Sequence, residues 1–523
     1  MNRLICNAVV LAIALAGGHP PAARAQSLDQ IGVTLLRAMT TNVDGSGIRV
    51  AQPEANVDGD TNNPSAFEVN PASVNQPASR FTYISAAGTT NTFPNSVGYE
   101  SGHADGVGGG FYGLSGGVAT NVAHIDNFDA DYFIDHYIVS NLTVLDAVVV
   151  NQSFTWGALA ITDQQAVDSA YDDYSESHGT LFVSAACNAS ISLKVCAPGT
   201  AYNCISVGAY GGDSSIGPTI DNSRCKPDIT APAGVTSFST PQVSGAAAVL
   251  MQAALRGDGG SDTNSAFDMR TIKALLLNGA VKPANWTNSN SSPLDARYGA
   301  GVVNVFNSYK QLVGGKRGCN FSTNIPTGSV HPPVVMSNFV AALSGWDFEN
   351  LSSDATNDAV NHYFFNATNG MATATLVWNR QLGETNINDL DLFLYNCASS
   401  NLVACSTSRV DNVEHIFVPR LAAGRYDLQV LKNGGTNVVS DSETCALAFA
   451  FVPTQLTLSR AGTNAVLTWP VYPAGFCLES TTNLAAPVWS TNNLSAAVTG
   501  STNTLQLPMT NAPQFFRLRQ PNF

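Results

Sequence analysis

The sequence predicts an α/β domain with a mainly parallel β-sheet flanked by helices. An antiparallel, jelly-roll-like β-sandwich and a small all-β module are expected to follow it. From about residue 45 to 310, short β-branched runs alternate with helical stretches, which is typical of a parallel sheet. From about residue 336, strand-like runs recur with turn residues between them, as in antiparallel sheets. With 44% hydrophobic and 12% charged residues, the chain has the composition of a globular protein.

The first 25 residues have the features of an export signal. Arg3 precedes the apolar run CNAVVLAIALAGG, and the segment closes on the small-x-small pattern of Ala23, Arg24 and Ala25. No run reaches the ~18 apolar residues that a membrane span needs. We therefore expect a secreted protein that begins near Gln26 and has no membrane contact after cleavage, with an uncleaved anchor as the alternative.

Charge and cysteine usage limit the partners and the compartment. The chain has 24 Lys and Arg against 38 Asp and Glu, a net charge of −14, which argues against nucleic acid as a partner. Cys6 lies in the signal, and in an oxidising compartment some of the nine other cysteines should pair. Cys397 and Cys405 would close a hairpin-sized loop. Four cysteines between 187 and 225 leave their connectivity open: Cys187, Cys196, Cys204 and Cys225.

The first domain is predicted to span residues 26–313. Its strands are expected in the runs IRVA, DAVVVNQSF, TLFVSAA and CISVGAY, and its later helices at 242–256, 265–280 and 302–313. Residues 314–335 contain Pro326, Pro332 and Pro333 and are predicted to be a linker.

Two β-rich units are predicted after this linker. The sandwich, 336–453, contains the runs MATATLVWN, DLDLFLYN, EHIFVPR, GRYDLQVLK and ALAFAFV. The last module, 454–523, contains LTLSR, AVLTWP, FCLEST, TLQLPM and QFFRLR. Its aromatic residues are expected to form a core, with binding of a surface or polymer as the second interpretation.

Four hydroxyl residues crowd the start of the predicted helix in VTSFSTPQVSGAAAVLM: Thr236, Ser237, Ser239 and Thr240. A helix N-terminus exposes free N–H groups and a partial positive charge, so a serine there can present both a hydroxyl and a donor to an oxyanion. Simple helix capping is the alternative. Three other stretches carry matching chemistry, namely an imidazole at His103, an amide at Asn188 after an apolar strand, and a carboxylate at Glu54.

These stretches resemble the subtilisin-like serine proteases, or subtilases, whose triad follows the order acid, histidine, serine. VTSFSTPQVSG matches the family's serine motif, G-T-S-x-A-T-P-H-V-A-G, at Thr236, Ser237, Thr240, Pro241, Val243 and Gly245. HADGVGG matches its histidine motif, H-G-T-H-V-A-G, more loosely, at His103, Val107 and Gly109. The resemblance covers about residues 45–310 and implies a subtilisin-like fold.

The resemblance also implies residue roles. Ser237 would be the nucleophile, His103 the general base, and Asn188 an oxyanion donor. Substrate-binding residues would lie along VVNQSF and just beyond it: Asn151, Ser153, Trp156 and Gly157. Packing is the alternative role for Trp156 and Gly157. The implied activity is peptide-bond hydrolysis in proteins or peptides, with no cofactor needed for chemistry. Ester hydrolysis and a catalytically inactive surface- or polymer-binding protein are the alternatives.

Three residues depart from the family pattern. Glu54 stands where most members have Asp, and Asp58 and Asp60 in the next loop are rival candidates for the acid. Val235 and Cys187 each replace a glycine beside the chemistry. Structural Ca²⁺ is a further expectation, with candidate ligands in DGDTNN (Asp58 and Asp60) and in NINDLDLFLYN (Asp389 and Asp391), against ordinary turns as the alternative.

Overall fold

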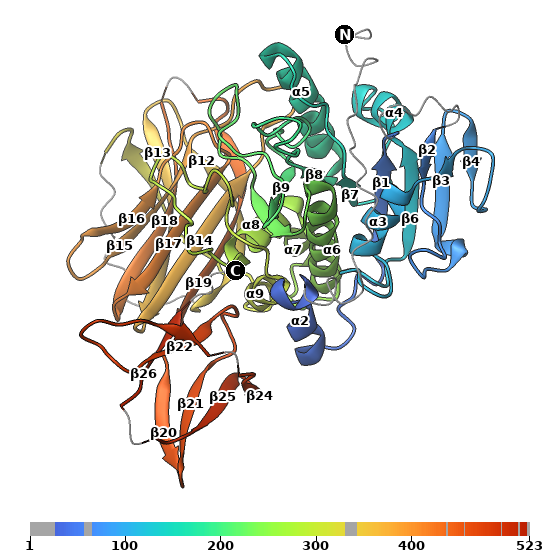
Figure 1. The fold of residues 1–523 in the computed structure, drawn as a ribbon. Helices are drawn as coiled ribbons and strands as arrows, with labels where there is room; N and C mark the ends of the chain where they lie inside the picture. The colour runs from blue at the N-terminus through green and yellow to red at the C-terminus, as the bar shows by residue number, and fades with distance from the viewer. Residues whose placement is uncertain are drawn as a thin grey trace.

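A computed structural model describes residues 27–56, 65–329, 342–435, 438–453, 455–492, 494–510 and 513–519. Figure 1 shows an α/β part, a β-sandwich beside it, and a smaller β-rich part at the C-terminal end of the chain. The predicted fold class is confirmed. The predicted signal, Asp58 and Asp60 lie outside the described residues.

The α/β part is built on an eight-stranded sheet in the order β10-β9-β8-β7-β1-β6-β3-β4, which is parallel except for β4. Its strands are β1 (Arg49–Glu54), β3 (Phe81–Ser85), β4 (Gly88–Thr90), β6 (His124–Asp129), β7 (Val149–Gln152), β8 (Leu181–Ala185), β9 (Ile205–Tyr210) and β10 (Ile229–Pro232). A separate pair joins β2 (Ala66–Glu68) to β5 (Tyr99–Glu100). The central strands of the large sheet are almost wholly buried because both of their faces are covered, whereas the edge strand β4 is partly exposed.

Successive strand residues contribute to opposite faces of this sheet. Val50 belongs to the core cluster that contains α3, α6, α8 and α9, whereas Ala51 belongs to the cluster that contains α4 and α5. The helices are α2 (Val33–Met39), α3 (Gly102–Phe111), α4 (Ala130–Phe133), α5 (Ile161–His178), α6 (Thr236–Leu255), α7 (Thr263–Phe267), α8 (Met269–Gly279) and α9 (Val305–Leu312), with a 3₁₀ turn at Ala78–Arg80 and a π-helical stretch at Ile134–Val139. α6 is buried along nearly its whole length, so its small residues bring the neighbouring elements close.

The β-sandwich consists of a five-stranded sheet, β11-β13-β18-β15-β16, and a four-stranded sheet, β12-β19-β14-β17. The strands are β11 (Asn320–Pro326), β12 (Ser344–Ser352), β13 (Asn357–Ala367), β14 (Gly370–Trp378), β15 (Leu390–Asn396), β16 (Leu402–Ser406), β17 (Val413–Leu421), β18 (Gly424–Lys432) and β19 (Ser442–Pro453). Each predicted strand run of this unit falls on a strand. β11 lies inside the predicted linker, where it pairs antiparallel with β13 across a register shift.

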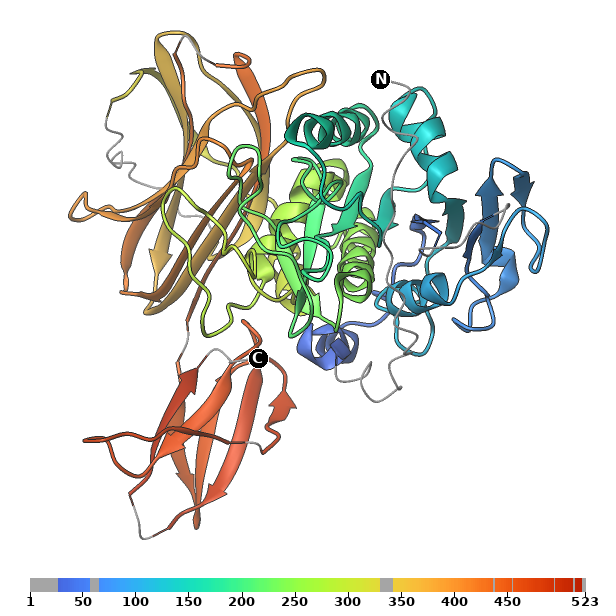
Figure 2. The same ribbon diagram turned by 45° about the horizontal axis from the view of Figure 1, so that its top comes forward.

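The C-terminal part has a four-stranded sheet, β20-β21-β25-β24, and a three-stranded sheet, β23-β22-β26. Its strands are β20 (Thr457–Ala461), β21 (Asn464–Pro470), β22 (Cys477–Thr481), β23 (Ser490–Thr491), β24 (Ala497–Thr499), β25 (Thr502–Pro508) and β26 (Phe515–Arg519). Its buried cluster contains Leu467, Trp469, Leu478 and Leu505. Of the aromatic residues expected to form a core, Trp469 does so, whereas Phe515 is 36% exposed. Figure 2 shows this part standing apart from the α/β sheet.

The α/β part and the sandwich share one hydrophobic core. The cluster around α6 and α8 also contains the sandwich residues Trp346, Val377, Val413, Ala446 and Ala448, as well as Val471. The indole N–H of Trp346 donates to the carbonyl of Leu312 at the end of α9, at 3.1 Å. The α/β part and the sandwich therefore share a continuous packed interior.

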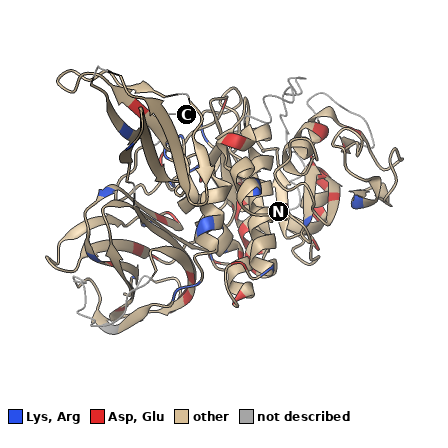
Figure 3. Ribbon diagram, turned by 90° about the horizontal axis from the view of Figure 1, so that it is seen from below, with Lys and Arg blue, Asp and Glu red and all other residues tan. Residues whose placement is uncertain are grey.

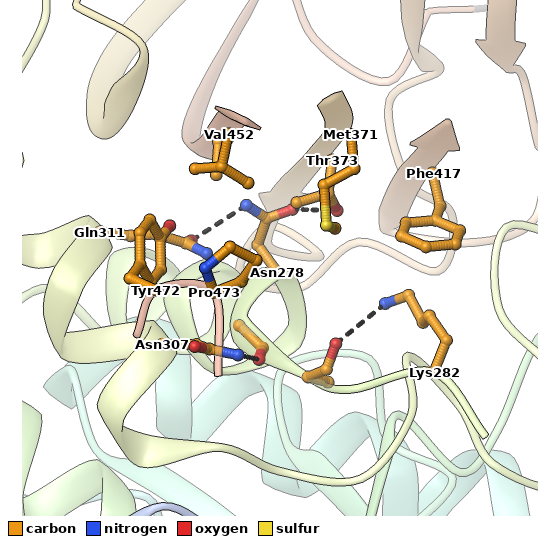
Figure 4. Close-up of a pocket in the computed structure, with 13 residues that line it drawn as sticks. Asn278, Lys282, Asn307, Gln311, Met371, Thr373, Phe417, Val452, Tyr472 and Pro473 are labelled. Atoms are coloured by element: carbon orange, nitrogen blue, oxygen red, sulfur yellow. Dashed lines mark hydrogen bonds between the residues drawn. The ribbon is translucent and has the colours of Figure 1, made fainter. Parts of the chain in front are cut away.

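A small cavity of about 20 Å³ lies where α8, α9, the sandwich and the segment after β21 meet (Figure 4). On its wall, Asn278 donates to Gln311 at 2.9 Å and accepts from Thr373 at 2.8 Å. Burial lowers the pKa of the Lys282 ammonium, which also lines this cavity, to about 7.

Among the described residues, none of the helices combines the length and the apolar character that a membrane span requires. Figure 3 shows acidic and basic residues scattered over all three parts.

Candidate active site

Ser237 is the second residue of α6, at the edge where the parallel strands of the sheet end. Its hydroxyl donates to the carbonyl of Ser153 at 3.3 Å, and the Ser153 hydroxyl donates back to the carbonyl of Ser237 at 2.9 Å. The neighbouring hydroxyls of Ser239 and Thr240 both donate to the carbonyl of Thr236 within the helix. The Ser239 and Thr240 hydroxyls therefore form hydrogen bonds within α6, whereas the Ser237 hydroxyl bonds to the segment that follows β7.

Val235, one of the residues that replace a glycine of the family pattern, precedes α6 in an extended conformation with φ −146°. A β-branched residue adopts this conformation without strain, because the left-handed region is not used. The turn into α6 therefore accommodates valine.

His103 and Glu54 form a buried pair at the same edge of the sheet. Glu54 is the last residue of β1, and His103 is the second residue of α3. His103 Nδ1 lies 2.8 Å from Glu54 Oε2, and the side chains are 5% and 1% exposed. Burial lowers the pKa of the His103 imidazole, but the charge of Glu54 and its hydrogen bond outweigh burial, so the pKa lies above the usual value. His103 Nε2 is buried without a hydrogen-bond partner among the described residues.

Two residues that the sequence reasoning missed support the other oxygen of Glu54, Gln52 directly and Tyr112 through Gln52. Gln52, two positions earlier on β1, donates from Nε2 to Glu54 Oε1 at 2.9 Å and to the carbonyl of Ala104 at 3.0 Å. The hydroxyl of Tyr112, at the end of α3, donates to Gln52 Oε1 at 2.6 Å. A glutamine two residues before a glutamate, in a strand that is buried on both faces, is the sequence signal that could have indicated this hydrogen-bonded support.

Asn188 lies beside the start of α6. Its Oδ1 accepts from the backbone N–H of Thr236 at 3.0 Å and from the Thr236 hydroxyl at 2.8 Å. With Oδ1 engaged in this way, Nδ2 remains as the donor of the amide. Cys187 just before it has φ +84°, in the left-handed region that glycine favours. Glycine, the family's usual residue at this position, adopts this conformation without strain, whereas cysteine does not.

α3 and α6 pack closely, which brings His103 to the start of α6. The rings of His103 and Phe238 lie 5.8 Å apart between centroids. A Cβ on Gly106 of α3 would stand 2.7 Å from the Phe238 ring, so only glycine allows this approach. No hydrogen bond between Ser237 and His103 occurs in this part of the structure, because the Ser237 hydroxyl is bonded to Ser153.

The predicted substrate-binding residues have mixed environments. Asn151 is fully buried, where it donates to the Ser153 hydroxyl at 3.0 Å and accepts from Ser244 of α6 at 2.8 Å. Trp156 is only 7% exposed and packs against Phe154 and Tyr171. Gly157 is half-buried with φ +64°. The side chains of Asn151 and Trp156 therefore lie in the interior, and among these four residues Ser153 hydrogen-bonds to Ser237.

The described residues contain no group of three or more His, Cys, Asp or Glu side chains that could hold a metal ion. Of the Ca²⁺ candidates in the sandwich, Asp391 accepts from Asn433 at 2.9 Å, and burial raises the pKa of its carboxyl to about 7. Burial likewise raises the pKa of Asp389. The nine described cysteines are free thiols, including the predicted pair Cys397 and Cys405.

Comparison with known proteins gives a family and several distant likenesses. Residues 121–301 match the family model described as the subtilase family. No curated protein matches the chain. A serine protease of Aeromonas sobria is 14% identical, with 97% of this chain and 96% of that chain covered at a TM-score of 0.39. Fervidolysin from Fervidobacterium pennivorans, described as a keratinolytic enzyme related to subtilisin, is 14% identical, with 89% and 77% covered at a TM-score of 0.36.

Proposed function

Since residues 121–301 belong to the subtilase family of serine peptidases, we propose that this protein is a secreted endopeptidase with Ser237, His103 and Glu54 as its triad. The observation that supports the proposal most directly is the buried His103–Glu54 pair, with a 2.8 Å contact, beside the helix α6, whose second residue is Ser237. A carboxylate on Nδ1 fixes the imidazole tautomer in which Nε2 is a proton acceptor. The free and buried Nε2 is then ready to take a proton.

The proposed reaction begins with a rotation of the Ser237 side chain. Its hydroxyl leaves the carbonyl of Ser153 and turns to His103 Nε2, which takes the proton as Ser237 Oγ attacks the substrate carbonyl. Catalytic hydrogen bonds are often long or misaligned before substrate binds, so this resting arrangement is compatible with activity. His103 then donates the proton to the leaving amine, and water hydrolyses the acyl-enzyme by the same route.

Two donors are proposed to stabilise the tetrahedral oxyanion: the Nδ2 group of Asn188 and the backbone N–H of Ser237 at the start of α6. Thr236 holds Asn188 Oδ1 from both its N–H and its hydroxyl, which orients the amide before substrate arrives. One pre-oriented donor of this kind typically contributes ~10²–10³ in rate.

The substrates are proposed to be proteins or peptides, bound along the segment after β7. A catalytically inactive protein that binds a surface or polymer is the second candidate. The observation that favours it is the Ser237–Ser153 hydrogen bond, which occupies the proposed nucleophile. Ester substrates are a third candidate, since acyl-enzyme chemistry does not distinguish an ester carbonyl from an amide.

Labelling with a fluorophosphonate tests the nucleophile. We expect a single adduct on Ser237 that is lost in Ser237→Ala and retained in Ser239→Ala, the matched control whose hydroxyl serves only the helix. Absence of an adduct on the folded wild-type chain would favour the inactive protein. Profiling the cleavage of a peptide mixture, with matched esters in parallel, then separates peptidase from esterase activity.

A further inference from the structure

Cys187 and Cys196 lie at the two ends of a loop that carries Asn188. Both cysteines are buried, with exposed fractions of 1% and 2%. The loop returns on itself, because the backbone N–H of Cys196 donates to the carbonyl of Ala186 at 3.3 Å, next to Cys187. Two thiols with eight residues between them are thus brought together at the base of the loop.

The backbone of Cys187 also indicates a role for its sulfur. With φ +84°, it holds a conformation that glycine would adopt without strain. Its Sγ accepts a hydrogen bond from the Thr155 hydroxyl at 3.5 Å. A hydrogen bond with Cys196 is the main reason that the pKa of the Cys187 thiol falls to about 7. The same contact raises the pKa of the Cys196 thiol, so Cys187 is the member of the pair that ionises first, and the thiolate is the form that attacks disulfides.

We propose that Cys187 and Cys196 are an oxidisable pair that forms an intramolecular disulfide and closes residues 188–195 into a ring. The oxidant is a small-molecule disulfide such as glutathione disulfide. The Cys187 thiolate attacks one donor sulfur and releases one donor thiol. Cys196 then attacks Sγ of Cys187, the protein S–S bond forms, and the second donor thiol leaves. The two protons of the protein thiols end on the two released thiols.

The loop between the cysteines provides access for the oxidant. Leu193 is 74% exposed and Ser190 is also exposed, so the outer part of the loop faces solvent, whereas Val195 near its base is buried. The oxidant therefore reaches Cys187 when the loop opens locally. Once closed, the ring restricts the backbone on both sides of Asn188.

The effect on catalysis rests on the proposed function. If Asn188 donates to the oxyanion, the bridged enzyme should have a kcat several-fold above that of the reduced enzyme, with KM nearly unchanged. A Cys187→Gly variant, which suits the left-handed backbone and cannot form the bridge, should show no dependence on the redox buffer.

Disulfide mapping tests the pair without requiring activity. The full chain is equilibrated with glutathione and its disulfide, quenched in acid, alkylated in denaturant and digested without reduction. We expect one cross-linked peptide that joins Cys187 to Cys196 in the wild type and in Cys405→Ser, a sandwich control, and none in Cys196→Ala. If both cysteines are alkylated in excess glutathione disulfide, or either pairs elsewhere, the proposal is wrong. A mapped bridge in a protein without turnover would instead contradict the proposed function alone.

Discussion

At the residue scale, the candidate site depends on a chain of buried hydrogen bonds. Tyr112 holds Gln52, Gln52 holds one oxygen of Glu54, and the other oxygen holds His103. Glutamate has one more rotatable bond than aspartate, so its carboxylate needs more support to keep one orientation. Gln52 supplies that support from the same strand.

Replacing Glu54 with Gln should reduce kcat by several orders of magnitude, because Nδ1 then loses the carboxylate that sets the tautomer. The charge of Glu54 raises the pKa of His103, and activity requires neutral His103. Any residual activity should therefore extend to lower pH than that of the wild type. Rates measured across pH check both effects, and an unchanged rate would transfer the acid role to Asp58 or Asp60.

Tyr112→Phe should lower kcat by about tenfold and leave KM nearly unchanged, because the loss of one buried hydrogen bond lets Gln52 and Glu54 reorient. The matched control is Tyr171→Phe, which removes a similar 2.7 Å bond to Gln152 away from Glu54. Steady-state kinetics and thermal unfolding of both variants distinguish the two roles. Equal losses of kcat would show that Tyr112 acts only through stability.

At the element scale, the position of the site depends on how α6 approaches α3. A Cβ on Gly245 would stand 2.5 Å from Cβ of Val118 and 3.1 Å from the carbonyl of Phe111.

The helices and strands that agree with the sequence predictions could be predicted because alternation and runs of small residues are local patterns. The strand β11, which lies in the predicted linker, could not be predicted, because its partner β13 lies over 30 residues away.

Gly245→Ala should destabilise the fold by about 1–3 kcal/mol, since a methyl group forced into this contact displaces α6. Gly102→Ala at the start of α3 is the control, because a Cβ there meets nothing within 4 Å. Denaturant unfolding of both variants measures the difference. Equal stabilities would mean that the packing of α3 on α6 is looser than the structure shows.

The candidate residues differ in the same way: some lie in local sequence motifs, and others acquire their roles only through contacts between distant elements. Ser237, His103, Asn188 and Glu54 carry motif patterns, so they could be proposed from the sequence. Gln52 and Tyr112 could not, because their roles appear only when α3 is packed on β1. The buried state of Asn151 likewise depends on Ser244 of α6, which is distant in the sequence.

At the scale of the whole molecule, the sandwich is fastened to the α/β part by buried polar contacts as well as by the shared core. Arg380, in the loop after β14, lies 3.2 Å from Asp172 of α5 through its Nε. The backbone N–H of Arg380 donates to Asn203 at 2.8 Å, and Asn203 donates back to its carbonyl at 3.0 Å.

Arg380→Ala should cost about 3–5 kcal/mol of stability, because it leaves the buried carboxylate of Asp172 without its charged partner. Arg256→Ala is the control, since its pair with Asp258 is at the surface and contributes little. Calorimetry should show the α/β and sandwich parts losing stability together in Arg380→Ala. Separate transitions in the wild type would contradict this coupling.

The common interior has a consequence for self-digestion. A peptidase that cuts its own chain between α9 and the sandwich breaks one covalent bond but leaves Trp346 and its neighbours packed against α9. Such a nicked molecule should run as two fragments on a denaturing gel and still sediment as a single particle. Trimming at this junction would therefore leave a two-chain protein rather than liberate a shorter enzyme.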